Sequence, residues 1–399
     1  MDQNKIVSVQ FIDNYFPIVD GVVHTVHNYA LNMCTDSSVA VATPKAKAPY
    51  DDSVYPYKVI RTKTFPLPFL EYSAAAPWFD AGCKKEIGSL SADIFHAHSP
   101  LLMGHFAVSL GKKLGVPVVS TFHSKYYDDA LNITGSKALA EFVKRYVVRH
   151  YNKADAVWAC SNGTADTLRS YGFKKDIFVM ENGSSMQIPE EKWDELKRAA
   201  KQKFALPEDK HVLLFVGHLI KHKNLPLILD TMRILCDKCD YYRLIIAGDG
   251  YDGEEIKKYA ESLCFTNDQV RFIGRVYDKE LLAGLYLCSG LFFFPSVYDN
   301  APLVVREAAA MRLPSLLTEG SNSAEAVIPD VTGYTAKEDA AFMCEKIQAV
   351  FKDEDARKKV GSEAQRVIPK TFAQITAQVR EKYAEIIEKY NFENKKTAR

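Results

Sequence analysis

Two carboxylates with seven residues between them stand where an apolar strand gives way to a helix, in residues 292–311. The strand pattern ends at Pro295, Asp299 follows in a polar loop, and Glu307 lies about one turn into the helix, facing the same cleft. Backbone N–H groups at a helix start bind anions. Here the predicted anion site, suited to a diphosphate, comprises Asn300, Ala301, Pro302 and Leu303.

A basic loop follows the strand predicted over residues 212–217. It begins at Gly217 and carries His218, Lys221, His222 and Lys223. The loop either presents cations to an anionic ligand or is the basic start of a helix facing solvent.

Histidines close two predicted strands in the first half of the chain. His96 and His98 end the strand over residues 94–98, and the alternation of a strand puts both imidazoles on one face. His123 follows the strand over residues 116–122. The first pair has the chemistry of zinc ligands, but no third ligand is evident.

Gly21 lies between the first strand and the first helix. A glycine there lets backbone approach a phosphate closely. An ordinary turn glycine is the alternative.

The elements that must position these residues alternate between short apolar strands and helical patterns, which predicts an α/β fold with parallel sheets. Ligands of such sheets bind beyond the carboxyl ends of the strands, here in a cleft between two doubly wound domains. We predict a Rossmann-like acceptor-binding domain over residues 1–190, a polar join over 184–210, a second Rossmann-like domain over 205–372 that binds the nucleotide sugar, and a helix over 373–399 that crosses back. The predicted strands span residues 5–12, 39–43, 94–98, 116–122, 156–161, 212–217, 244–248, 270–274 and 290–295.

The ordered series of motifs resembles the retaining family 4 glycosyltransferases of GT-B fold. Besides the acidic pair, the resemblance rests on Phe215-Val216-Gly217, Gly248-Asp249-Gly250, residues 270–274 and Glu325 ahead of residues 330–333. It covers almost the whole chain. It implies an enzyme that moves a sugar from a nucleotide sugar, such as UDP-glucose, to a hydroxyl with retention and no required cofactor or metal.

By this resemblance, Glu307 accepts hydrogen bonds from the donor ribose and Asp299 holds hydroxyls of the transferred sugar. Lys223 neutralises the departing β-phosphate. Asp299 stands where the family usually has Glu, and His218 stands where it has arginine. Because a histidine is only partly charged near neutral pH, either His218 is protonated beside the diphosphate or Lys221 supplies the second charge.

The remaining roles implied by the resemblance concern the donor base and the first domain. Arg275 and Val276 hold the base through their backbone, and Gly21 lies beside the diphosphate, as Gly217 does. His123 contacts the transferred sugar. His98 and Tyr126 are predicted in the acceptor pocket.

Composition narrows the partners and the location. The net charge of +1 gives no electrostatic reason to expect nucleic acid. The N-terminus lacks a signal-peptide pattern, no window has the roughly 18–20 apolar residues of a membrane span, and the eight cysteines are scattered, so we expect a cytoplasmic protein. Cys236 and Cys239 have metal-ligand spacing without a second pair, and the Asp-Glu-Asp run at 353–355 lies in a charged helical pattern away from any strand end.

The acceptor is the least determined partner. The Phe-, Leu- and Pro-rich stretch over residues 62–69 and the basic, amphipathic helix Lys137–Tyr151 suggest a lipid-linked acceptor and contact with the inner face of an anionic membrane. Burial of that helix against a sheet is equally compatible with the pattern. Alternative functions are a nucleotide-sugar epimerase or phosphorylase of the same fold and a non-catalytic subunit that binds sugar nucleotides.

Overall fold

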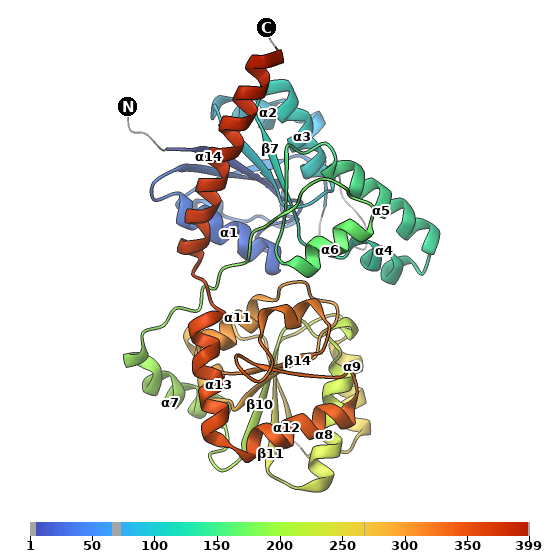
Figure 1. Cartoon of the computed structure of the whole chain (residues 1–399), viewed down its shortest axis with the longest axis vertical. Helices are drawn as coiled ribbons and strands as arrows, with labels where there is room; N and C mark the ends of the chain where they lie inside the picture. The colour runs from blue at the N-terminus through green and yellow to red at the C-terminus, as the bar shows by residue number, and fades with distance from the viewer. Residues whose placement is uncertain (1–4, 66–72, 267, 398–399) are drawn as a thin grey trace. The chain divides into compact units, whose positions relative to one another are not determined.

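The computed structural model describes residues 5–65, 73–266 and 268–397, and the chain divides into two compact units (Figure 1). The first unit comprises Met1–Gly183 and Phe372–Arg399, and the second comprises Ser184–Thr371. The chain therefore enters the second unit once and then returns to the first.

The first unit contains, in its described residues, a seven-stranded parallel sheet in the order β3-β2-β1-β6-β7-β8-β9. Its strands are β1 (Val7–Phe11), β2 (Ser38–Pro44), β3 (Lys58–Thr62), β6 (Ile94–Ala97), β7 (Val118–Phe122), β8 (Ala156–Ala159) and β9 (Phe178–Val179). A small antiparallel pair, β4 (Thr64–Phe65) and β5 (Ala74–Ala75), lies outside this sheet.

Helices cover the sheet of the first unit, and its central strands β1, β6, β7 and β8 are therefore mostly buried, whereas the edge strands β3 and β9 are partly exposed. The helices are α1 (Gly21–Met33), α2 (Ala81–Ser89), α3 (Leu102–Leu114), α4 (Tyr126–Thr134), α5 (Lys137–Tyr151), α6 (Asn162–Ser170) and α14 (Phe372–Thr397), with the short helices η1 (Asp52–Val54) and η2 (Pro77–Phe79). Figure 1 shows α14, which contacts α1, running across this unit.

The second unit has a six-stranded parallel sheet in the order β12-β11-β10-β13-β14-β15. Its strands are β10 (His211–Val216), β11 (Tyr242–Ala247), β12 (Val270–Gly274), β13 (Leu291–Phe294), β14 (Ser315–Thr318) and β15 (Tyr334–Ala336). In both sheets the first strand of the series lies between its second and fourth, which is the Rossmann order with a switch point for ligands beside the first strand. The structure thus has the predicted α/β class and two doubly wound sheets.

The helices of the second unit include one that the sequence analysis assigned to a join between domains. They are α7 (Trp193–Phe204), α8 (Leu225–Lys238), α9 (Gly253–Ser262), α10 (Lys279–Cys288), α11 (Leu303–Ala310), α12 (Ala340–Lys352) and α13 (Glu354–Val367), with η3 (Glu190–Lys192), η4 (Lys221–Lys223) and η5 (Asn322–Ala326).

The predicted polar join over residues 184–210 is wrong, because α7 packs against α10 inside the second unit. Trp193, Leu196 and Ala200 form the buried face of α7, while its charged residues face solvent. A Cβ on Gly284 of α10 would lie 2.4 Å from the carbonyl oxygen of Leu196, so the two helices meet at a glycine. The charged residues of the exposed face made this segment resemble a polar linker, although it forms an amphipathic helix.

The described residues can be compared with three features of the sequence: a membrane span, a metal site and the apolar stretch over residues 62–69. No helix among residues 5–65, 73–266 and 268–397 is long and apolar enough to cross a membrane. Over the same residues no three His, Cys, Asp or Glu side chains gather as metal ligands, and Cys236 and Cys239 are free. Residues 66–69 of the predicted lipid-facing stretch lie outside the described part of the chain.

Candidate active site

Backbone contacts join the loops that follow β10, β11 and β12 at the carboxyl edge of the second sheet. The N–H of Gly217 donates to Ala247 O at 3.0 Å, and the N–H of Gly248 donates to Gly274 O at 2.8 Å. Gly248 has φ +148°, and a Cβ there would lie 1.9 Å from the oxygen of Gly217. Only glycine fits at position 248. The predicted Gly217 therefore lies in a tightly packed part of this edge, with its backbone against that of Gly248.

Lys223, which follows β10, and Asp299, which follows β13, form an ion pair at the same carboxyl edge of the sheet. The Lys223 ammonium donates to Asp299 Oδ1 and also lies 5.4 Å from the centre of the Phe294 ring. Their side chains are only 14% and 17% exposed. The second oxygen of Asp299, Oδ2, is buried and has no hydrogen-bond partner. A buried acceptor without a partner is costly, and a ligand hydroxyl at this position would remove that cost.

Hydrogen bonds from the end of the next strand fix the loop that carries Asp299. Ser323 Oγ donates to the carbonyl oxygen of Asp299 at 3.2 Å, and the N–H of Asp299 lies 3.4 Å from Ser296 Oγ. Asn322 donates to the Asn300 side-chain oxygen at 2.9 Å. The carboxylate is therefore held on a rigid loop and does not depend on ligand for its position.

Three helices, α8, α9 and α11, begin at this edge without a side-chain cap. The first turn of α9 carries Glu254 and Glu255, so α8 and α11 are the two that suit an anion. Asn224 precedes α8 and Pro302 precedes α11, and neither side chain bonds to the first turn of its helix. Uncapped first-turn N–H groups bind anions. The predicted run of donors needs a correction at one position, because Pro302 has no N–H; donors of the α11 turn begin at Leu303.

Glu307 lies within α11, where Tyr286 of α10 donates to its Oε2 at 3.1 Å. Burial raises the pKa of Glu307, while the hydrogen bond from Tyr286 and the charge of Lys279 lower it. No local sequence pattern indicated Tyr286, because its hydrogen bond to Glu307 arises from the packing of two helices.

The basic loop separates into side chains with different partners. Lys221 pairs with Glu255 of α9 at 2.9 Å, and its N–H donates to Asp252 at 2.8 Å. The hydrogen bond to Glu255 raises the pKa of Lys221. His222 stacks on the Tyr298 ring at 5.3 Å. Lys221 is thus engaged by α9, and Lys223 is the lysine of this loop that meets Asp299.

His218 and Arg275 are exposed, whereas Val276, the other residue predicted to border the base, is partly buried. Arg275 donates through Nε to Asp249 at 2.9 Å and lies 5.7 Å from the Tyr277 ring centre. Val276 packs against the core of the second unit. The carboxylate of Asp249 therefore holds the Arg275 side chain. Contact between the Arg275 backbone and the donor base stays a prediction.

In the first unit, a hydrogen-bonded row joins Gln10 to His98 and His123 at the carboxyl ends of β1, β6 and β7. His98 Nε2 lies 2.9 Å from Gln10 Oε1, and His98 Nδ1 lies 3.3 Å from His123 Nε2. Burial lowers the pKa of His123 to about 4 and that of His98 well below its usual value. Both rings are therefore neutral near pH 7.

This row determines which nitrogen of each ring carries the proton. The Gln10 amide nitrogen lies 3.2 Å from Ser8 Oγ, so its oxygen faces His98. In this arrangement His98 donates from Nε2 to Gln10 Oε1, and its Nδ1 accepts from His123 Nε2.

Acidic residues that the sequence analysis did not select lie in the same part of the first unit. Asp13 follows β1 directly; Ser99 donates to it, and so does the Met103 N–H at 3.0 Å, while burial raises its pKa to about 6. Burial raises the pKa of Asp129 to about 7 and that of the predicted acceptor residue Tyr126 well above its usual value. The position of Asp13 at a strand end was a usable signal; Asp129 lies inside a helix and gave none.

Gly21 is the first residue of α1, and a Cβ there would meet nothing within 4 Å. Open space beside its backbone fits an approaching ligand. However, the Asp20 carboxylate already accepts from the N–H groups of Val22 and Val23, both at 2.8 Å. The phosphate contact of Gly21 stays a prediction, and so does a donor held by residues of both units.

The two sheets, each with polar groups at its carboxyl edge, define a GT-B class of nucleotide-sugar enzyme. The family model "Glycosyltransferase Family 4" matches residues 19–186, and "Glycosyl transferases group 1" matches residues 197–367. The chain belongs to the family 4 glycosyltransferases, retaining enzymes that use nucleotide sugars. This assignment confirms the predicted family, fold class and enzyme class.

Relatives resemble the chain in sequence, and solved structures share its fold. The chain is 25% identical to an alpha-monoglucosyldiacylglycerol synthase of Streptococcus pneumoniae, over 76% of this chain and 69% of that protein. It is 22% identical to a GDP-mannose-dependent alpha-mannosyltransferase of Mycolicibacterium smegmatis, over 91% and 92%. The crystal structure of Anabaena HepE in complex with UDP and glucose has a TM-score of 0.74, 15% identity, and coverage of 96% of this chain and 99% of that one. WaaG, a glycosyltransferase of lipopolysaccharide biosynthesis, has a TM-score of 0.69 with 16% identity, over 94% and 99%.

Proposed function

We propose that this enzyme transfers a hexose from a UDP-sugar, such as UDP-glucose, to a hydroxyl of a lipid-linked or cell-envelope acceptor, with retention and without a metal. The observation that carries the proposal is the Lys223–Asp299 pair with its unpartnered Oδ2. It supplies a cation for a phosphate and an acceptor for a sugar hydroxyl in the same place.

The charges fit the departure of a nucleoside diphosphate. Lys223 and the uncapped starts of α8 and α11 stabilise the growing negative charge on the β-phosphate. Glu307 accepts hydrogen bonds from the ribose, and the backbone of Arg275 and Val276 holds the base. A sugar that binds Asp299 Oδ2 satisfies the buried oxygen and orients the anomeric carbon.

We propose front-face substitution for the chemical step. The bond from the anomeric carbon to the β-phosphate oxygen breaks, and a bond to the acceptor oxygen forms on the same face. The departing phosphate oxygen takes the acceptor proton, so no enzyme nucleophile is needed. His123 contacts the transferred sugar, and His98 and Tyr126 serve the acceptor.

A UDP-sugar donor is favoured by the HepE complex with UDP and glucose, and a lipid acceptor by the diacylglycerol glycolipid synthase among the relatives. The hairpin of α4 and α5 supports contact with a membrane. It exposes Ile133, Leu139 and Phe142, by 80%, 43% and 60%, near the exposed cations Arg145 and Arg149. Apolar side chains among cations suit the inner face of an anionic membrane, where we place this cytoplasmic enzyme.

Substitution at the two donor residues tests the proposal. Lys223→Ala and Glu307→Ala should each abolish sugar transfer while circular dichroism at the assay temperature shows a folded chain. A lower unfolding temperature is expected, because the changes leave the partly buried Asp299 and the buried Tyr286 without these partners. Lys257→Ala, an exposed lysine of α9 paired with Glu254, is the matched control. Full transfer activity in either donor-site variant would refute the site.

A thermal-shift screen of UDP- and GDP-sugars identifies the donor, because a ligand that binds the folded state raises its stability. Mass analysis after incubation with the donor alone then separates transfer from epimerisation. An epimer formed without acceptor would replace the transferase proposal with an epimerase.

A further inference from the structure

A second cavity, of about 360 Å³, lies at the amino edge of the second sheet, at the opposite strand ends from Lys223 and Asp299. It opens where His211 begins β10, where Gly290 precedes β13 and where Pro314 precedes β14. We call it the amino-end pocket. Its volume is within the range of about 300–1,000 Å³ usual for small-molecule sites.

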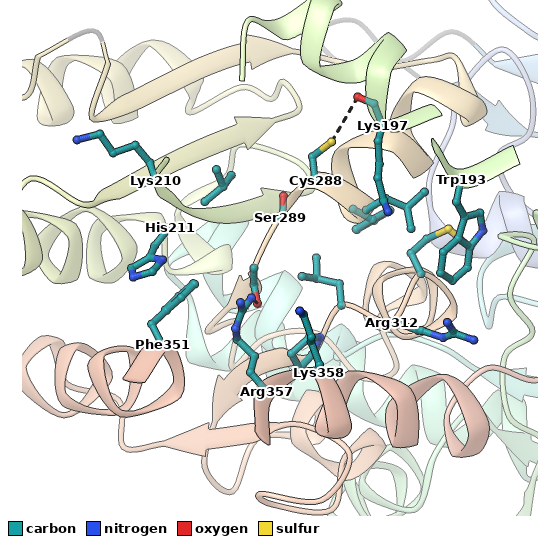
Figure 2. Close-up of a pocket in the computed structure, with 17 residues that line it drawn as sticks. Trp193, Lys197, Lys210, His211, Cys288, Ser289, Arg312, Phe351, Arg357 and Lys358 are labelled. Carbon is teal, nitrogen blue, oxygen red and sulfur yellow. Dashed lines mark hydrogen bonds between the residues drawn. The ribbon is translucent and has the colours of Figure 1, made fainter. Parts of the chain in front are cut away.

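The lining of the amino-end pocket has one sign of charge. None of the 17 described residues that line it is Asp or Glu, whereas five are cations, namely three lysines and two arginines. Lys197 from α7 and Arg357 and Lys358 from α13 point into the pocket from opposite sides (Figure 2). Lys210 and Arg312 point away from its centre in the same view.

Arg357 is the least satisfied of these cations. Its Nη1 donates to Gly290 O at 2.9 Å, and its guanidinium lies 4.8 Å from the centre of the Phe351 ring. The Nε of Arg357 is buried and has no hydrogen-bond partner. Burial lowers the pKa of the group. A buried guanidinium donor beside an open cavity is a donor that an oxyanion can satisfy.

Within the described part of the chain, the other two inward cations pair with exposed carboxylates on their own helices. Lys197 lies 3.4 Å from Asp194, and Lys358 lies 2.7 Å from Glu354. Exposed pairs of this kind are worth about 0–1 kcal/mol, so an anion in the pocket can compete for both lysines. The rings of Trp193 and Phe351 add apolar wall for the body of such a ligand.

We infer that the amino-end pocket binds a phosphate group carried on a small organic molecule, with Arg357, Lys197 and Lys358 as its ligands. The volume fits a hexose phosphate, and the headgroup of an anionic phospholipid presents the same chemistry. The pocket lies at the opposite strand ends from Lys223 and Asp299, although Tyr286, which bonds Glu307, also lines it. The inference does not depend on the proposed reaction.

Calorimetric titration of the full chain with glucose 6-phosphate tests the inference, with alkylation of Cys288, which lines the pocket, to locate the binding. Exposed Cys264 is the internal control. We expect saturable binding that slows alkylation of Cys288 and leaves Cys264 unchanged. Binding without protection of Cys288 would overturn the inference.

Variants separate recognition from general charge. Arg357→Lys keeps the charge but loses Nε, and Lys197→Gln with Lys358→Gln removes two charges; each should weaken binding at least tenfold. Lys210→Gln, a lining lysine that points away and pairs with Asp240, should leave the affinity unchanged. Wild-type affinity in both Arg357→Lys and the double lysine variant would overturn the inference. If Arg357→Lys did not fold, wild-type affinity in the double lysine variant would overturn it alone.

A vesicle arm distinguishes the two sources of phosphate. Phosphatidylglycerol vesicles that bind the wild-type chain, protect Cys288 and bind the same variants more weakly assign a lipid headgroup. Glucose 6-phosphate binding without such vesicle binding assigns a free phosphate ester. Neither probe protecting Cys288 would refute the site.

Discussion

Asp299 uses one carboxylate oxygen to hold Lys223 and leaves the other buried without a partner. In Asp299→Asn the shape is kept, but Lys223 loses its counter-charge. We therefore expect UDP to bind as tightly as in wild type or more tightly, because the freed ammonium meets the phosphate. Sugar transfer should fall about 10- to 100-fold, since a hydrogen bond to a charged group is worth roughly 1.5–3 kcal/mol.

Calorimetry of UDP binding and initial rates of transfer separate these two effects. Lys221→Gln in the same loop is the control, because Lys221 is held by Glu255; it should change neither quantity. If Asp299→Asn weakened UDP binding as strongly as Lys223→Ala, the aspartate would be a phosphate-site residue and not a sugar ligand.

The Tyr286 hydroxyl stabilises the ionised form of Glu307, whose pKa burial raises. A ribose hydroxyl needs the carboxylate as acceptor, so donor affinity is full above this pKa and declines as the pH falls through it. Tyr286→Phe removes the hydrogen bond and raises the pKa of Glu307 further. The decline in UDP affinity should then begin at higher pH.

Titrations of UDP affinity against pH measure that change. Tyr242→Phe, at a buried tyrosine of β11 in the same unit, is expected to leave the profile in place. An unshifted profile in Tyr286→Phe would mean that Glu307 does not control donor binding.

The residues proposed for the donor site were selected from sequence, but their partners in the structure were not. Asp299 and Lys223 follow strand ends, where parallel sheets collect ligand groups, so their type and position marked them. The ion pair between them joins residues 76 apart, and Glu255 captures Lys221 from another helix. Such pairings depend on side-chain packing across elements, which no local pattern specifies.

Among the elements, α7 and α10 show how a charged helix becomes part of a core. Gly284→Ala places a Cβ against Leu196 O, and overpacking of this kind costs about 1–3 kcal/mol. The amides of α7 and α10 should therefore exchange with solvent faster than in wild type. Hydrogen exchange measured by mass spectrometry reports this locally.

Gly88→Ala in α2 is the opposing control, because nothing lies within 4 Å of a Cβ there. A helical Gly to Ala change with free space stabilises by about 0.5–1 kcal/mol. Equal protection of α7 in wild type and Gly284→Ala would show that these helices tolerate separation.

The strands and helices themselves were largely predictable, because apolar runs and helical periodicity are local. The helix pattern of α5 left its exposed face open, and the structure buries Val147 and Tyr151 while exposing Phe142. The segment that forms α7 was wrongly assigned to a join between domains. Its many charged side chains obscured the helical spacing of its three buried residues, Trp193, Leu196 and Ala200.

If that exposed face of α5 enters a bilayer, Leu139→Ser with Phe142→Ser should weaken binding to anionic vesicles by about 100-fold or more, because each buried apolar side chain contributes roughly 1.5–3 kcal/mol and two are removed. Vesicle co-sedimentation measures the change. Phe342→Ser, an exposed phenylalanine of α12, is the matched control. Equal binding of the double variant and wild type would remove α5 from the membrane surface.

For the whole molecule, the return of the chain through α14 makes the first unit depend on its last helix. Tyr383 of α14 is buried, bonds to His96 Nδ1 at 2.6 Å and stacks on Trp158 with ring centres 5.7 Å apart. No sequence pattern linked this tyrosine to a histidine 287 residues earlier. Helical periodicity predicted α14. Its contacts with His96 and Trp158 arise because the chain returns to the first unit after it has formed the second.

Tyr383→Phe tests this dependence, because it keeps the ring stack and removes the hydroxyl. His96 Nδ1 is then buried without a partner, at a cost of about 1–3 kcal/mol. Hydrogen exchange should therefore accelerate in β1, β6 and α14, while exchange in β10 and β13 and the affinity for UDP stay at wild-type values. Tyr259→Phe, which removes only an exposed bond to Asp230, is the control for loss of a hydroxyl. Equal acceleration of exchange in both units of Tyr383→Phe would mean that the units unfold together, and unchanged exchange in the first unit would mean that α14 is not part of its core.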